Sequence, residues 1–175
     1  MRMKLIIVMG SMLAASGCIP RAEQPRDEPA RPAPQVQVPS PVAPPSADWR
    51  DIPLTPGNWR YGPQASGSAA SFGPAGGEAL FVVRCDRANR RLILSLRGAQ
   101  QGPMTIRTST LSRALPIQVE EGASAYSNAV LAAVDPFLDA MVFSRGRFTV
   151  EAPGQRMLVI PSWAEPARVV EDCRG

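Results

Sequence analysis

Prolines dominate residues 19–47, and this stretch restricts the fold more than any other feature of the chain. It holds nine prolines in 29 residues and no aromatic side chain. Proline fixes the backbone φ angle and has no N–H group, so a helix or a central strand cannot form at this density. We expect residues 18–47 to be a disordered, extended Pro-rich tether. Residues 48–175 remain for a folded part, which is the length of one globular domain.

The segment before the tether has the order of a secretory signal peptide. Arg2 and Lys4 precede an apolar run at 5–15, which is too short to cross a membrane as a helix. The run ends in Ala-Ser-Gly-Cys, and this ending resembles the lipobox of bacterial lipoproteins. The resemblance implies that residues 1–17 are a signal peptide that is removed, and that Cys18 is lipidated.

The lipobox resemblance also implies a location. Lipoproteins of this kind carry several acyl chains on the cysteine, and two or more chains give stable membrane anchoring. In a cell with two membranes, Ile19 lacks the acidic character that usually retains lipoproteins at the inner membrane. We therefore expect a lipid-anchored protein of the cell envelope that faces the periplasm, with the outer membrane favoured over the inner membrane.

Short apolar runs separated by polar turns fill residues 48–175, and this pattern predicts antiparallel strands. Runs 79–85 and 91–97 predict one hairpin, while 145–151 and 156–160 predict another, with Phe148 facing inward and Thr149 outward. Further strands are expected at 58–61, 69–72, 104–110 and 112–119. The aromatic residues near the start of the domain are expected to pin its first strand into the core, although an exposed recognition surface is the alternative: Trp49, Trp59 and Tyr61.

Two short helices are expected among the strands. Asp135 followed by Pro136 is a helix start signal, with Asp as the N-cap. Ser162 and Glu165 have the spacing of a capping box and predict a final helix to about Asp172. Its apolar stripe would contain Trp163, Ala167, Val170 and Cys173. The predicted fold is mainly β, a small antiparallel β-sandwich or barrel with two short helices.

Two cysteines remain once Cys18 is assigned to lipid. Cys85 shares the predicted inward face of its strand with Phe81 and Val83, and Cys173 ends the final helix. In an oxidising compartment these two cysteines are expected to form a disulfide. Free thiols or a redox pair are the alternative, which the lack of a Cys-x-x-Cys spacing disfavours.

The chain contains no histidine, and Lys4 is its single lysine. This composition excludes Ser-His-Asp and Cys-His catalysis, imidazole metal ligands and catalytic lysines in the mature chain. No metal or cofactor is expected. A carboxylate-based hydrolase remains as an enzymatic alternative, because Asp135 and Asp139 lie four residues apart on the predicted helix. Helix capping by Asp135 and a favourable dipole interaction of Asp139 are the preferred interpretation.

Arginines crowd the turn of the first predicted hairpin, at Arg84, Arg87, Arg90 and Arg91. Arginine suits contacts with carboxylates and phosphates, so this patch could bind lipopolysaccharide, an acidic envelope protein or a peptidoglycan-associated partner. A solvated turn is the alternative interpretation. Nucleic acid is not an expected partner, because the compartment is wrong and basic residues do not alternate with aromatic ones.

Two family resemblances concern the folded part. The sequence Phe-Val-Val-Arg-Cys-Asp at 81–86 resembles membrane-bound lysozyme inhibitors, and the order of helix, Ser144-Arg145-Gly146 and strand resembles the invasion-associated protein B family. Both imply a small secreted β domain. The Ser-Gly-x-x-Tyr signature of the inhibitors is not matched, so no inhibitory residues are implied. The expected function is a non-catalytic binding or structural module, with inhibition of a cell-wall hydrolase as the alternative.

Overall fold

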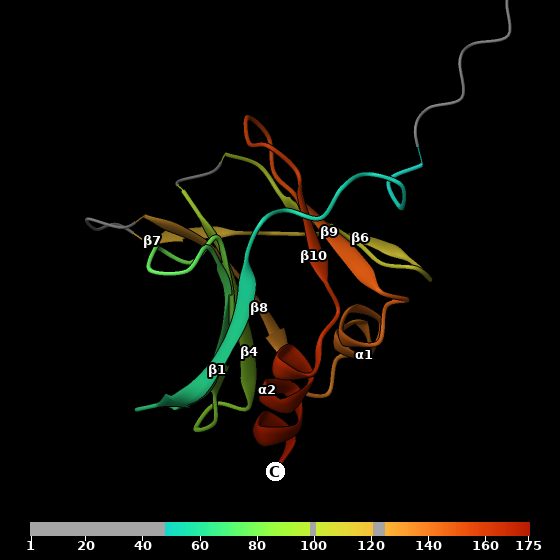
Figure 1. The fold of residues 1–175 in the computed structure, drawn as a ribbon. Helices are drawn as coiled ribbons and strands as arrows, with labels where there is room; N and C mark the ends of the chain where they lie inside the picture. Colours follow the sequence, from blue (N-terminus) through green and yellow to red (C-terminus); the bar gives the residue numbers. More distant parts are fainter. Residues whose placement is uncertain (1–47, 99–100, 121–124) are drawn as a thin grey trace, which may run out of the picture. The chain divides into compact units, whose positions relative to one another are not determined.

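A computed structural model describes residues 48–98, 101–120 and 125–175. The predicted signal peptide at 1–17, the predicted tether at 18–47 and the predicted lipidation site, Cys18, lie outside the described residues. In the described part, two antiparallel sheets and two helices confirm the mainly β prediction (Figure 1). The sheets are separate, which makes the fold a sandwich rather than a barrel. Within these ranges no helix is long and apolar enough to cross a membrane.

The larger sheet has six strands in the order β1-β2-β3-β4-β8-β7. The hairpin predicted around residue 88 is confirmed, with Phe81 opposite Leu96 and Asp86 opposite Arg91. The strands are β1 (Asn58–Gln64), β2 (Gly67–Gly73), β3 (Phe81–Asp86), β4 (Arg91–Arg97), β7 (Gln118–Glu120) and β8 (Tyr126–Ala132).

The smaller sheet has four strands in the order β10-β9-β5-β6. It contains the second predicted hairpin, in which Val150 of β9 pairs with Leu158 of β10. Helix α2 packs against β1, β2 and β3 and also contacts α1. The remaining elements are β5 (Met104–Arg107), β6 (Ser112–Leu115), β9 (Arg147–Glu151), β10 (Leu158–Pro161), α1 (Pro136–Val142) and α2 (Ala164–Arg174).

The core lies between the two sheets and is rich in aromatic rings. Phe81 of β3 and Phe148 of β9 are fully buried, and their ring centroids are 6.1 Å apart, so this pair joins the sheets. Trp59 is also buried and donates its indole N–H to the Pro161 carbonyl at 2.8 Å. The prediction that Trp59 pins the first strand into the core is confirmed, and Tyr61 packs against the same core. Trp49 is also buried, but it lies before β1 and outside this cluster.

Three strand predictions were wrong in detail. The run 112–119 is not one strand, because the chain divides around Pro116 into β6 and β7, which belong to different sheets. Strand β8 was missed, although it pairs with β4 along its full length. Thr149 was expected outside but is fully buried, and its hydroxyl donates a hydrogen bond to the Glu151 carboxylate at 3.3 Å.

The predicted start of α1 is confirmed, whereas the predicted start of α2 is wrong. The Asp135 carboxylate accepts a hydrogen bond from the Phe137 backbone N–H at 2.9 Å. The N-cap of α2 is Trp163, one residue after Ser162, and it makes no side-chain capping bond. The Ser162 backbone N–H, whose hydrogen bond Glu165 would accept in a capping box, donates to the Gly146 carbonyl instead. Trp163 is 45% exposed rather than buried, and the apolar side of α2 is formed by Pro166, Val169, Val170 and Cys173.

Candidate functional site

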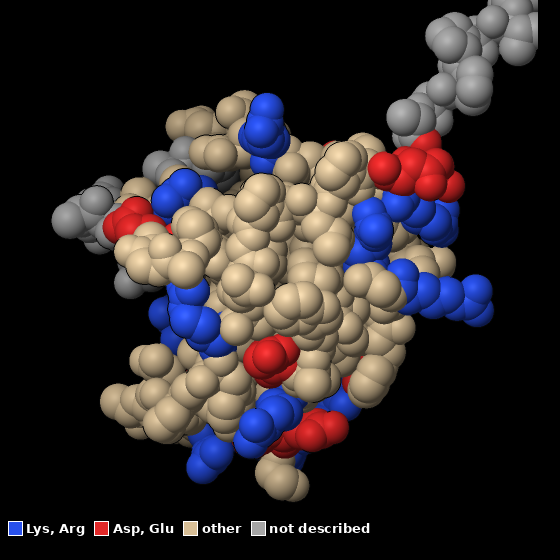
Figure 2. Space-filling model, in the orientation of Figure 1, with Lys and Arg blue, Asp and Glu red and all other residues tan. Residues whose placement is uncertain are grey.

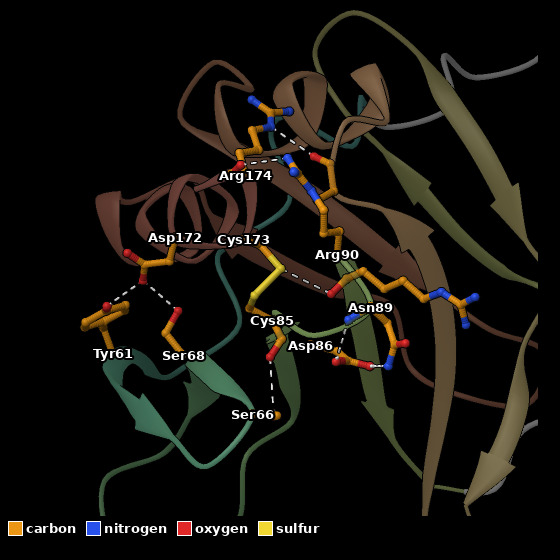
Figure 3. Close-up of a disulfide and its surroundings, with 12 residues drawn as sticks. Tyr61, Ser66, Ser68, Cys85, Asp86, Asn89, Arg90, Asp172, Cys173 and Arg174 are labelled. Carbon is orange, nitrogen blue, oxygen red and sulfur yellow. Dashed lines mark hydrogen bonds between the residues drawn. A yellow bond between two sulfur atoms is a disulfide. The ribbon is translucent and has the colours of Figure 1, made fainter.

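The predicted disulfide is present between Cys85 on β3 and Cys173 near the end of α2 (Figure 3). Their Cα atoms are 5.4 Å apart, within the range that a disulfide requires. Both cysteines are almost completely buried. Cys85 reaches the interior because it alternates with Arg84 and Asp86 along the strand, as expected from the sequence. The bond therefore attaches the last helix to the middle of the larger sheet.

Asp172 connects the same turn of α2 to β2, which neighbours β3, and to β1 beyond it. Its Oδ2 atom accepts hydrogen bonds from the Ser68 hydroxyl on β2 and the Tyr61 hydroxyl on β1, each at 2.6 Å. These bonds, that from Ser68 first, hold the pKa of the Asp172 carboxyl below its ordinary value. The guanidinium of Arg168 also lies 4.3 Å from the Tyr61 ring centroid. Helix α2 is thus fixed to three consecutive strands.

Arginines complete this attachment. Arg90, in the β3–β4 turn, donates to the Arg174 carbonyl at 2.8 Å. Its φ of 51° is unusual for a residue with a side chain, and the turn directs Arg90 toward α2 (Figure 3). Arg174 in turn donates to the Ala133 carbonyl at 2.9 Å and forms an ion pair with Asp139 at 2.8 Å. The disulfide and its surroundings therefore have a structural role.

Replacement of Asp172 by asparagine is expected to lower the free energy of unfolding by about 1 kcal/mol at neutral pH, because two hydrogen bonds lose a charged acceptor. Since the folded pKa is lower than the unfolded one, the charged carboxylate stabilises the fold above the unfolded pKa. That contribution is lost as the pH falls through the folded pKa. Urea unfolding of both proteins at a series of pH values measures the effect.

The difference between wild type and Asp172→Asn is expected to be constant above about pH 5 and to shrink steadily below about pH 4. Asp51→Asn is the control, because Asp51 is exposed and no side-chain bond of it is present in the described structure. A difference that persists unchanged at low pH would contradict the role assigned to the charge.

The carboxylates considered for hydrolysis are held by separate arginines. Arg113 donates to both carboxylate oxygens of Asp135, each at 2.9 Å, and Asp135 also caps α1. Asp139 forms an ion pair with Arg174. Each acid therefore has a structural partner, in line with the capping role expected for Asp135. Among the described residues, no group of three or more acidic or cysteine side chains could hold a metal ion.

The four arginines of the predicted patch do not form one surface: two lie on strands of the larger sheet and two lie in the β3–β4 turn. Arg84 on β3 and Arg91 on β4 lie on the solvent side of the larger sheet, with Arg91 opposite Asp86 in the strand register. Asn89 donates to both oxygens of the Asp86 carboxylate and lowers its pKa. Arg90 instead bonds to α2, as described above, and Arg87 is held in the turn through its backbone N–H.

The side of the larger sheet that faces away from α2 and the smaller sheet is called here the outer face. Two neighbouring rows of paired residues cross β1, β2 and β3 on this face. They are Gly62–Ala69–Arg84 and Arg60–Ser71–Val82. Figure 2 shows a hollow with basic side chains on the left of the molecule, the side to which this face is turned in Figure 1. The arginines that the register places on this face are Arg60, Arg84, Arg91 and Arg97.

A pocket of about 380 Å³ opens on the outer face where β1, β2 and β3 meet. Arg60 and Arg84 stand on its two sides, while Ala69 and Ser71 of the intervening strand form its floor. Its other lining residues are Tyr61, Gly62, Gln64 and Val82. Of its two arginines, Arg60 donates to the Pro74 carbonyl at 3.3 Å. Arg84 is partly buried, and within the described residues no hydrogen bond or ion pair satisfies its guanidinium.

A smaller pocket of about 50 Å³ adjoins the first and shares Val82 and Arg84 with it. Ser95 of β4 lines this space and is only 3% exposed, yet its hydroxyl has no hydrogen-bond partner. Tyr126 forms another wall and donates its hydroxyl to the Ala79 carbonyl at 2.9 Å. Burial raises the pKa of this tyrosine, with a further contribution from Glu78.

Sequence reasoning identified Arg84 but missed Arg60 and Ser95. Arg60 is far from the arginine-rich turn along the chain and joins Arg84 only through the pairing of β1 and β3 with β2. The alternation of Trp59 and Tyr61 with Arg60 could have placed Arg60 on the outer side. Comparison of the chain with protein-family models, curated proteins and solved structures gave no match.

Proposed function

We propose that the protein is a lipid-anchored component of the cell envelope whose folded domain is a non-catalytic binding module facing the periplasm. The outer face of the larger sheet is the binding surface of this module. One observation carries the proposal: Arg84 is partly buried in a pocket with a second arginine, and the described structure supplies its guanidinium with no acceptor. A guanidinium that no protein acceptor occupies and that opens into a pocket is available to an anionic partner from outside the domain.

The other side of the sheet is used for folding rather than for binding. The core, the disulfide and α2 cover the inner face. Asp135 and Asp139, the carboxylates of the hydrolase alternative, are engaged by Arg113 and Arg174. A binding role on the outer face therefore has more structural support than hydrolysis at α1. The partner we propose is an anionic component of the envelope, with the outer membrane as the site of anchoring.

A photo-reactive amino acid placed at Val130 tests the binding surface. Val130 is 48% exposed and lies on the outer face, in the same register row as Ile93 and Arg84. Irradiation of intact cells is expected to give slower-migrating adducts of the full-length protein. Val134 is the matched control, because it is 70% exposed but lies beyond the end of β8. Equal adducts from both positions, or none from Val130, would contradict the proposal.

Replacement of Cys18 by alanine tests the anchor. Cells fed an alkyne-tagged fatty acid are expected to label the wild-type protein and not the variant, since the cysteine sulfur is the proposed acceptor. The variant is also expected to leave the membrane fraction. Ser16→Ala is the control, because it keeps a small residue before Cys18 and is expected to retain the label. A labelled or membrane-bound Cys18→Ala protein would exclude lipidation at this cysteine.

A further inference from the structure

We propose that the pocket between Arg60 and Arg84 binds the phosphate of a phosphorylated sugar. This inference rests on the proposed function, because it takes the outer face as the binding surface, and it adds the chemical class of the ligand. It depends on the shape of the pocket floor, on the charge of its lining and on two donors without partners. None of these features contributes to the attachment of α2.

The pocket floor is open because the residues between the arginines are small. Gly62 pairs with Ala69, and Ala69 pairs with Arg84, so this row across three strands has a long side chain only at its β3 end. A Cβ atom added at Gly62 would meet no atom within 4 Å. In the neighbouring row, Ser71 lies between Arg60 and Val82. Both guanidinium groups can therefore approach one ligand group seated above β2.

The charge of the lining favours a phosphate over a carboxylate. The pocket has two arginines and no acidic residue among its lining side chains. A phosphate monoester carries about −1.5 to −2 charges at neutral pH and offers three acceptor oxygens, so it can bind both guanidinium groups at once. A carboxylate has one charge and is suited to a single arginine fork. The balance of charge therefore points to a phosphomonoester.

One buried polar atom beside the pocket also lacks a partner. Arg84 borders both pockets, and the hydroxyl of Ser95 in the smaller one is buried without a hydrogen bond. Buried donors are normally satisfied by protein, water or ligand. The Ser95 hydroxyl on β4 lies two strands from a phosphate seated above β2, so a water molecule in the 50 Å³ space beside Arg84 is the partner expected to link them.

The size of the larger pocket favours a sugar attached to the phosphate. A volume of about 380 Å³ is well above that of a phosphate group alone and lies in the range of small-molecule sites. Gln64 and Ser71 provide amide and hydroxyl groups at the lining, which suit sugar hydroxyls. A single phosphorylated sugar ring satisfies both the charge and the volume.

Calorimetric titration of the full-length protein in a neutral detergent tests the inference. The probes are glucosamine 1-phosphate, glucuronate, which bears a carboxylate, and uncharged glucose. Glucosamine 1-phosphate is expected to bind about tenfold more tightly than glucuronate, and glucose is expected to show no binding. Equal binding of phosphate and carboxylate, or binding of glucose alone, would overturn the inference.

Variants separate the pocket from general attraction to a basic protein. Arg84→Gln and Arg60→Gln are each expected to weaken phosphate binding by about tenfold or more, since each removes a charged donor. Gly62→Leu is expected to abolish binding by filling the open space, at a position with no positive φ to strain. Arg156→Gln is the matched control, because Arg156 is exposed in the β9–β10 turn and does not line the pocket. Equal losses in the control would overturn the inference.

A lipid-linked source is distinguished from a soluble one by comparing lipid A with its dephosphorylated form in the same detergent. Tighter binding of lipid A than of glucosamine 1-phosphate assigns the pocket to a lipid-linked sugar, and the reverse assigns it to a soluble one. If no phosphorylated probe binds while Val130 still gives adducts in cells, the phosphate inference fails and the proposed binding surface stands. If Val130 gives no adducts, the proposed function itself fails.

Discussion

Replacement of both Cys85 and Cys173 by alanine is expected to lower the free energy of unfolding by about 4 kcal/mol, because the disulfide closes a long loop. The two cysteines are 88 residues apart, so their bond removes much conformational entropy from the unfolded chain. The hydrogen bonds of Asp172 remain in the variant and keep α2 directed toward β1 and β2. Urea unfolding of the full-length proteins gives the difference.

Wild-type protein unfolded in the presence of a reductant is the control for this prediction. It is expected to lose about as much stability as the double variant, since both lack the covalent link. The variant itself is expected to be unaffected by the reductant. A double variant within about 1 kcal/mol of the oxidised wild type would show that contacts of α2, rather than the disulfide, hold the helix on the sheet.

Phe81→Ala is expected to destabilise the domain by about 3 to 5 kcal/mol, the usual cost of a large cavity in a core. Phe81 is fully buried, and its ring centroid lies 6.1 Å from that of Phe148 and 6.4 Å from that of Trp59. The change therefore removes the ring that connects the two sheets. Differential scanning calorimetry is expected to show a lower melting temperature and a lower unfolding enthalpy.

Phe143→Ala is the matched control for the core substitution. Phe143 follows α1 and is 69% exposed, so the same chemical change there leaves no cavity in the core. Its effect is expected to stay within about 0.5 kcal/mol of wild type. Similar losses at the two positions would contradict the assignment of Phe81 to the centre of the sandwich.

Local signals in the sequence were sufficient for the features that depend on neighbouring residues. The hairpin of β3 and β4 follows from two apolar runs around a polar turn, and the start of α1 follows from Asp135 and Pro136. The pairing of Cys85 with Cys173 was also predicted, because two cysteines remained after Cys18 was assigned to lipid and an oxidising compartment was expected. These predictions need no knowledge of how distant strands are arranged.

Features that depend on distant pairing were missed. Strand β8 contains small and polar residues with weak strand preference, such as Ala129 and Asn128, and it is stabilised by pairing with β4. Residues 112–119 form two strands that belong to different sheets, and in the sequence only Pro116 indicates where the first strand ends. Ser162 has a suitable spacing for a cap, yet its backbone is held by Gly146. Tertiary contacts outweigh local preference in all three cases.

The candidate site was predictable only in part for the same reason. Arg84 was predicted because other arginines lie near it in the sequence. The prediction, however, grouped arginines that are close along the chain and not those that lie on neighbouring strands of the sheet. The pocket instead runs across β1, β2 and β3, which brings Arg60 beside Arg84. The orphan hydroxyl of Ser95 depends on side-chain packing that no sequence pattern records.

The position of the disulfide has a consequence for the order in which the protein matures. During translation Cys85 is added to the chain 88 residues before Cys173. The Cys85–Cys173 bond therefore cannot form until almost the entire domain has been synthesised. A chain that stops before residue 173 cannot acquire the bond, so covalent closure marks only those molecules whose translation reached the last turn of α2.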